Sequence, residues 1–237
     1  MGDGGIARIN PIFPCFYAED PFRGTLTGTA MNKRIIFGVI VLCLAVAVWS
    51  FLGPGRQRSI RNAPPANPTI VAFGDSLTSG VGAGQGGSYP SQLSARIGRK
   101  IINLGVPGET TQSAMARLDD VLGYNPGIVL ITLGGNDLKN GVGRQVAFQN
   151  LSFIIGVFQQ EGAMVILGGI DIPFWGRDFG TGYRETADAM GVVLVPDIYD
   201  GILGKPGLMS DRIHPNDKGY GIMAGHFFKA LKPYLAP

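Results

Sequence analysis

From Thr69 to the C-terminus the sequence alternates between short apolar runs and amphipathic stretches, and this alternation restricts the possible folds more than any other feature. Five runs are typical of strands buried on both faces: TIVAFG, IINLG, IVLITLG, MVILGG and VVLVPD. Helical patterns separate or follow them, at residues 89–97, 111–122, 145–160, 183–190 and 218–231. Such alternation, with short glycine-bearing connections, predicts one α/β domain over residues 69–237. We expect a three-layer α/β/α sandwich with a doubly wound, five-stranded parallel sheet.

The 68 residues before this domain have a different character. Residues 35–52 are 18 consecutive residues without a charge, and as a helix they would span roughly 27 Å. Because two basic residues directly precede them, we expect a transmembrane signal anchor or, alternatively, a signal peptide cleaved at a small-x-small site at residues 45–47. Residues 1–34 are then an N-terminal extension, either disordered or upstream of the native start. Residues 53–68 are rich in Pro and Gly and predict a linker.

Charge and cysteine content argue against two classes of partner. The formal net charge is +3, but residues 1–68 hold seven Lys/Arg against three Asp/Glu (+4), whereas residues 69–237 hold thirteen against fourteen (−1). The domain is therefore nearly neutral, and we expect no nucleic-acid partner. Both cysteines, Cys15 and Cys43, precede the domain, and it contains no zinc-ligand spacing. We expect no metal and no cofactor.

Polar residues follow three of the predicted strands. Ser76 comes directly after the first strand in FGDS, Gly105 ends the second, and Asn136 follows the third in LGGND. Asp211 and His214 occur together before the last helix, in DRIHP. Because ligands bind beyond the carboxyl ends of parallel strands, we expect these residues to gather at one edge of the sheet.

This set of residues suits nucleophilic catalysis. A serine hydroxyl needs a base to take its proton, and the chain has only two histidines, His214 and His226. His214 has Asp211 three residues before it, close enough to orient the imidazole ring, whereas His226 lies within a helical pattern and is read as structural. The residues also have simpler interpretations: Ser76 is a candidate helix N-cap and Gly105 a candidate tight turn.

An acyl-transfer intermediate also requires donors for its oxyanion. The backbone N–H groups of Ser76 and Gly105 and the side-chain amide of Asn136 are the candidates. Glycine at position 105 would let the backbone approach a substrate without a Cβ in the way.

Four stretches in order, FGDSLTSG, NLGVPGETT, LGGND and DRIHPNDKGY, resemble the blocks of the SGNH, or GDSL-type, hydrolase superfamily. The resemblance covers residues 69–235 and is greatest to bacterial acyl-CoA thioesterase I/arylesterase/lysophospholipase-type esterases. It implies a flavodoxin-like sheet, a catalytic triad of Ser76, Asp211 and His214, and an oxyanion hole of Ser76, Gly105 and Asn136. The one local departure is Pro107, where family members often carry a small polar residue.

The resemblance implies a serine esterase or thioesterase that hydrolyses acyl, aryl or lysophospholipid esters through an acyl-enzyme. Candidates for the acyl groove are Leu138, Ile172, Pro173, Phe174 and Trp175, although the last four also suit a loop packed under a helix. The alternatives are an O-acetyl esterase of cell-envelope carbohydrate and a non-catalytic acyl-binding module. The N-terminal segment implies a membrane partner: anchoring at a bacterial inner membrane with the domain in the periplasm, or secretion to the periplasm after cleavage.

Overall fold

The computed structural model describes residues 32, 35, 37–44, 59–172 and 177–235. The chain divides into two compact units, Met1–Arg56 and Gln57–Pro237. In the first unit residues 35 and 37–44 are helical and exposed. None of the described residues belongs to a helix both long and apolar enough to cross a membrane. Residues 45–52 of the predicted apolar segment lie outside the described residues.

The second unit contains the predicted five-stranded sheet. Its strands are β1 (Ile70–Gly74), β2 (Ile101–Gly105), β3 (Ile128–Thr132), β4 (Met164–Gly168) and β5 (Val193–Val195). All four pairings are parallel, and the order is β2-β1-β3-β4-β5. This is the flavodoxin-like order, with its topological switch point between β1 and β3. The predicted α/β fold and sheet are confirmed.

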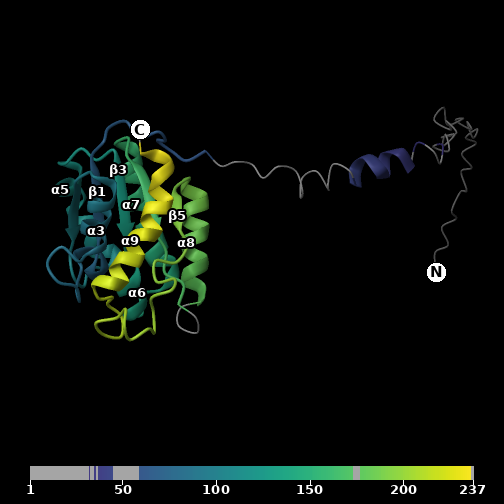
Figure 1. Cartoon of the computed structure of the whole chain (residues 1–237). Coiled ribbons are helices and arrows are strands. Elements are labelled where there is room, and N and C mark those ends of the chain that lie inside the picture. The colour runs from purple at the N-terminus through teal and green to yellow at the C-terminus, as the bar shows by residue number, and fades with distance from the viewer. Residues whose placement is uncertain (1–31, 33–34, 36, 45–58, 173–176, 236–237) are drawn as a thin grey trace, which may run out of the picture. The chain divides into compact units, whose positions relative to one another are not determined.

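The helices of this unit cover both faces of the sheet, which gives three layers (Figure 1). The α-helices are α2 (Ser76–Ser79), α3 (Tyr89–Ile97), α4 (Thr111–Ala114), α5 (Leu118–Leu122), α6 (Gly135–Lys139), α7 (Arg144–Gln160), α8 (Arg177–Met190) and α9 (Asp217–Leu231). Two 3₁₀ turns, η1 (Met115–Arg117) and η2 (Lys232–Tyr234), complete the set. Helices α3 and α9 pack against each other in one layer, and α7 packs against α8 in the other.

The core lies between the sheet and these layers. Every residue of β1, β3 and β4 is buried, as expected for central strands covered on both faces. The register aligns Gly74 of β1 with Gly105 of β2 and Thr132 of β3. Three strands therefore end at the same level, and the loops that follow them start from one edge.

Three segments differ from the predicted boundaries. The helix predicted over residues 183–190 begins earlier, as α8 starts at Arg177. The helix predicted over residues 111–122 is divided into α4, η1 and α5. Part of the predicted linker packs on the domain: Arg61 donates to Gln159 Oε1 at 3.1 Å, and the Asn62 amide donates to the carbonyls of Gln159 and Ala163 at 2.8 and 3.0 Å. These bonds join residues about one hundred positions apart, so composition alone could not reveal them.

Candidate active site

Ser76 is the first residue of α2, directly beyond the buried strand β1. The helix is capped by Asp75, whose Oδ1 accepts the Leu77 N–H at 3.0 Å. Ser76 is therefore not the N-cap, and the interpretation of this serine as a capping residue is wrong. Its hydroxyl is left for another partner.

That partner is His214. The distance from Ser76 Oγ to His214 Nε2 is 3.1 Å, and the distance from His214 Nδ1 to Asp211 Oδ2 is 2.7 Å. Hydrogen bonds from His214 Nδ1 and from the N–H groups of Ile213 and His214 lower the pKa of Asp211 to about 2. An ionised carboxylate can only accept, so Nδ1 carries the imidazole proton and Nε2 is free to accept the proton of Ser76 Oγ.

The loop that holds His214 is itself hydrogen-bonded. Asp211 Oδ1 accepts the N–H groups of Ile213 and His214 at 2.8 and 2.7 Å. The Ser210 N–H donates to the His214 carbonyl at 2.8 Å. From outside the loop, the Tyr199 hydroxyl donates to the Ile213 carbonyl at 2.6 Å. The local spacing of Asp211 and His214 thus forms a closed turn.

Asn136, in α6, lines the same cavity as Ser76. Its side-chain amide donates to the Glu109 carbonyl at 2.9 Å and to Asp75 Oδ2 at 3.3 Å. Asp75 is only 2% exposed. Burial raises its pKa to about 7, the Leu77 N–H opposes this rise, and the nearby Glu109 carboxylate adds to it. One buried carboxyl therefore connects the turn of Ser76 to the amide of Asn136.

Two further contacts fix the loop after β2. The buried Glu109 carboxylate forms a bidentate pair with Arg117, with both N–O distances 2.6 Å. The Arg117 guanidinium also lies 4.6 Å from the centroid of the Phe73 ring. The buried Asp137 carboxylate accepts the Thr111 hydroxyl at 2.6 Å and the Thr111 N–H at 2.9 Å. The loops after β2 and β3 are thereby joined through buried polar bonds.

Gly105 does not have the free N–H that the prediction required. Its N–H donates to Asn103 Oδ1 at 3.0 Å, and a Cβ at this position would lie 2.1 Å from the Ser79 nitrogen. Glycine is needed here because β2 packs closely against α2. By contrast, the N–H groups of Ser76 and Gly108 have no acceptor among the described residues.

Sequence reasoning missed Gly108. It lies next to Glu109, whose carbonyl holds the Asn136 amide, and its φ of +82° is a conformation that favours glycine. The signal in the sequence was the second glycine of NLGVPGETT, which comes shortly before the short helix α4.

A cavity of about 150 Å³ opens beside Ser76, with a mostly apolar lining. Of the five candidates for the acyl groove, Leu138 and Ile172 line this cavity, whereas Pro173, Phe174 and Trp175 lie outside the described residues. The structure adds residues that the sequence patterns did not indicate: Leu77, Lys139, Ile170, Tyr199 and Ile213. They come from five different segments of the chain.

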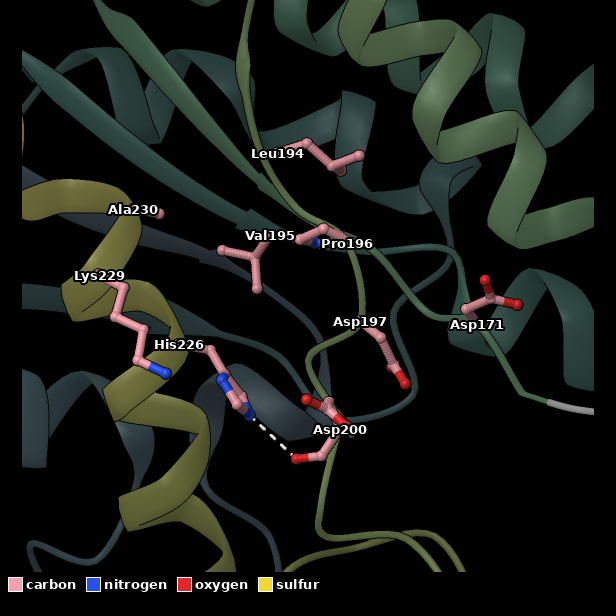
Figure 2. Close-up of a pocket in the computed structure, with 9 residues that line it drawn as sticks. All are labelled: Asp171, Leu194, Val195, Pro196, Asp197, Asp200, His226, Lys229 and Ala230. Atoms are coloured by element: carbon pink, nitrogen blue, oxygen red, sulfur yellow. Dashed lines mark hydrogen bonds between the residues drawn. The ribbon is translucent and has the colours of Figure 1, made fainter.

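Figure 2 shows a larger and more open cavity of about 710 Å³, lined by residues of β5, α9 and the loops after β4 and β5. It contains none of the residues that surround Ser76. His226 lies here, with Nε2 3.0 Å from the Asp200 carbonyl oxygen, away from any serine hydroxyl. Among the described residues, no group of three or more His, Cys, Asp or Glu side chains could hold a metal ion.

Comparisons with known proteins agree with this arrangement. The GDSL-like lipase/acylhydrolase family matches residues 72–222. An arylesterase of Vibrio mimicus is 32% identical over 73% of this chain and 92% of its own length. The thioesterase 1/protease 1/lysophospholipase L1 of Escherichia coli K12 is 30% identical over 72% of this chain and 86% of its own.

A solved structure supports the same assignment. The crystal structure of TesA superposes with a TM-score of 0.68 at 29% identity, covering 71% of this chain and all of that one. Sequence family, curated relatives and three-dimensional fold thus agree, as the resemblance predicted. The chain belongs to the GDSL-like lipase/acylhydrolase family, and it is a GDSL-type hydrolase that acts on ester bonds.

Proposed function

We propose that this protein is a serine esterase that also accepts thioesters, with Ser76 as nucleophile, His214 as general base and Asp211 as the residue that orients His214. The observation that carries the proposal is the continuous line of hydrogen bonds from Asp211 Oδ2 through both imidazole nitrogens to Ser76 Oγ. A serine aligned in this way loses its proton to Nε2 as it attacks a carbonyl carbon.

In the first step Ser76 Oγ attacks the ester carbonyl, and His214 takes the proton. The protonated imidazole, stabilised by the Asp211 carboxylate, then gives this proton to the leaving alcohol or thiol. A water molecule, deprotonated by His214, attacks the acyl-enzyme and releases the carboxylic acid and Ser76. The proton transfers of this cycle involve only Ser76, His214, the substrate and water.

The oxyanion needs two or three donors. We assign the Ser76 N–H and the Asn136 amide, as predicted. For the third donor Gly108 fits better than the predicted Gly105, because the Gly105 N–H already donates to Asn103. The longer bond of the Asn136 amide, at 3.3 Å to Asp75, is the one that an incoming oxyanion can share.

The cavity beside Ser76 favours an acyl chain over a carbohydrate, because most of its lining is apolar. An engineered apolar cavity of similar volume holds benzene, so a space of about 150 Å³ suits roughly six carbon atoms. We therefore propose short to medium acyl groups. The arylesterase and thioesterase names of the relatives support an ester or thioester substrate.

The proposed location, at the membrane or in the periplasm, rests on the apolar character of residues 35–52 and the basic residues before them. Fractionation of cells that express the full chain tests it, since a protein confined to the cytoplasm would contradict both the anchor and the signal-peptide interpretation.

A p-nitrophenyl ester series from acetate to palmitate tests the activity. Wild type should hydrolyse the shorter esters, whereas Ser76→Ala should lose at least a thousandfold in kcat and should no longer react with a fluorophosphonate probe. Ser94→Ala is the matched control, because Ser94 only donates to the Arg99 carbonyl at the end of α3. Near-normal hydrolysis by Ser76→Ala would refute the proposed function.

A further inference from the structure

Tyr199 connects two parts of the site that the mechanism treats separately. It follows β5, is 7% exposed and lines the cavity beside Ser76. Its hydroxyl donates to the Ile213 carbonyl at 2.6 Å. Ile213 directly precedes His214, so the same side chain contacts both the acyl cavity and the loop of the catalytic base.

Among the described residues, the other hydrogen bonds of residues 210–214 run within the loop, apart from the bond of His214 to Ser76. Asp211 is exposed, and its Oδ1 holds the N–H groups of Ile213 and His214 from within the loop. Those bonds shape the turn but do not determine its distance from Ser76. The Tyr199 hydroxyl attaches the Ile213 carbonyl to the turn that follows β5, and so limits how far Nε2 can move away from Ser76.

The hydroxyl is suited to this purpose because it remains a donor. Burial raises the pKa of Tyr199 far above its ordinary value, and the carboxylates of Asp75 and Asp211 and the neighbouring Tyr220 raise it further. The hydroxyl therefore keeps the proton that it donates to the Ile213 carbonyl. The ring, in turn, has a fixed position against the cavity because both ends of the side chain are held.

We propose that Tyr199 is both a positioning residue for His214 and a determinant of acyl-chain length at this site. The hydroxyl holds the base loop in reach of the nucleophile, and the ring limits the depth available to the acyl chain. The inference rests on the proposed esterase function and adds to it the residue that couples substrate size to the geometry of the base.

Two variants of the full chain separate the two roles. Tyr199→Phe keeps the ring and removes the bond to Ile213, so kcat should fall by roughly ten- to a hundredfold for every ester of the series, with KM within about twofold of wild type. Tyr199→Leu also removes the ring, so it should show the same loss in kcat and, in addition, a best substrate about two or more carbons longer.

Tyr220→Phe is the matched control. Its hydroxyl donates to the Val81 carbonyl at 2.8 Å, and it does not line the cavity. Its melting temperature should fall about as much as that of Tyr199→Phe, while its kcat and chain-length profile remain those of wild type. A merely structural role of Tyr199 would make the two Phe variants alike in activity.

The outcomes distinguish this proposal from the proposed function. If Ser76→Ala keeps its activity, the function is refuted. If Ser76→Ala is inactive but Tyr199→Phe retains the wild-type kcat, the positioning role is refuted and the function stands. An unchanged chain-length optimum in Tyr199→Leu would refute the role in specificity. Should Tyr199→Leu fold poorly, Tyr199→Met, whose flexible side chain replaces the ring, gives the same comparison.

Discussion

Asp211→Asn is the most informative single change, because it keeps the shape of the catalytic loop and alters one proton. Asp211 Oδ1 accepts two backbone N–H groups, and Oδ2 accepts one imidazole proton. An asparagine that keeps the two backbone bonds must turn its NH₂ group toward His214 Nδ1. The opposite orientation would keep the bond to the imidazole but lose both backbone bonds. Because each neutral hydrogen bond contributes about 1 kcal/mol, this orientation is the minor form.

The consequence for the imidazole is a change of tautomer. With a donor facing Nδ1, the proton moves to Nε2, which then points an N–H at Ser76 Oγ and can no longer take its proton. In serine proteases the same substitution lowers kcat by about 10⁴, which corresponds to roughly 5.5 kcal/mol of activation free energy. We expect a loss of about 10³–10⁴ in kcat, with little change in KM, since the acyl cavity is unaltered.

The assay is steady-state hydrolysis of p-nitrophenyl butyrate, together with thermal denaturation. Asp217→Asn is the control, because the Asp217 carboxylate also accepts a backbone N–H, from Gly84 at 2.8 Å, but contacts neither Ser76 nor His214. Both variants should fold normally and only Asp211→Asn should be inactive. A folded Asp211→Asn enzyme with less than a tenfold loss in kcat would refute the tautomer argument.

Substitutions at four other positions, Gly105, Gly108, Arg117 and Asp75, test the support of the site. Gly105→Ala should prevent stable folding, because its Cβ would lie 2.1 Å from a backbone nitrogen of α2. At Gly108 an added Cβ meets no atom, so Gly108→Ala should lower the free energy of unfolding by only about 1–2 kcal/mol, the cost of a positive φ for alanine. Thermal denaturation distinguishes the two variants. Arg117→Met should lower the free energy of unfolding by about 3–5 kcal/mol, since it leaves the Glu109 carboxylate buried and unpaired. In urea denaturation, the double variant Arg117→Met/Glu109→Gln should recover much of this loss. Burial raises the pKa of Asp75 from an ordinary 3.8 to about 7 in the native state. At a pH between these two values, Asp75 is protonated in the native state and ionised in the unfolded state. The free energy of unfolding should therefore fall, by at most roughly 4 kcal/mol, as the pH rises from about 4 to about 7, and Asp75→Asn should remove this dependence in urea titrations. A pH dependence unchanged in Asp75→Asn would contradict the assignment.

Local sequence patterns predicted the framework well. The five strands have continuous apolar runs because both faces of a parallel sheet are covered, and such runs end where the chain leaves the sheet. Ser76, Asn136 and the pair Asp211 and His214 all follow such ends or precede a helix, so their gathering at one edge follows from the parallel direction of the strands. The spacing of three residues between Asp211 and His214 also determines a turn that needs no distant contact.

Other features depend on contacts between segments far apart in the chain. Sequence alone could not show that Asp75, rather than Ser76, caps α2, or that the Gly105 N–H is already engaged. The position of Tyr199 against both the cavity and the base loop depends on how β5 pairs with β4 and where the loop after it turns. None of these positions has a periodicity or a motif that reports its partner.

The sequence by itself therefore determined the fold class and the order of the polar residues along the sheet edge, because both follow from short-range pattern and strand direction. It also gave Ser76 and His214 as the candidates for nucleophile and base. The tertiary structure alone decided which backbone N–H groups are engaged, which side chains line the cavity beside Ser76 and which contacts hold the loop of His214. Those properties arise from hydrogen bonds and packing between residues brought together only when the sheet assembles.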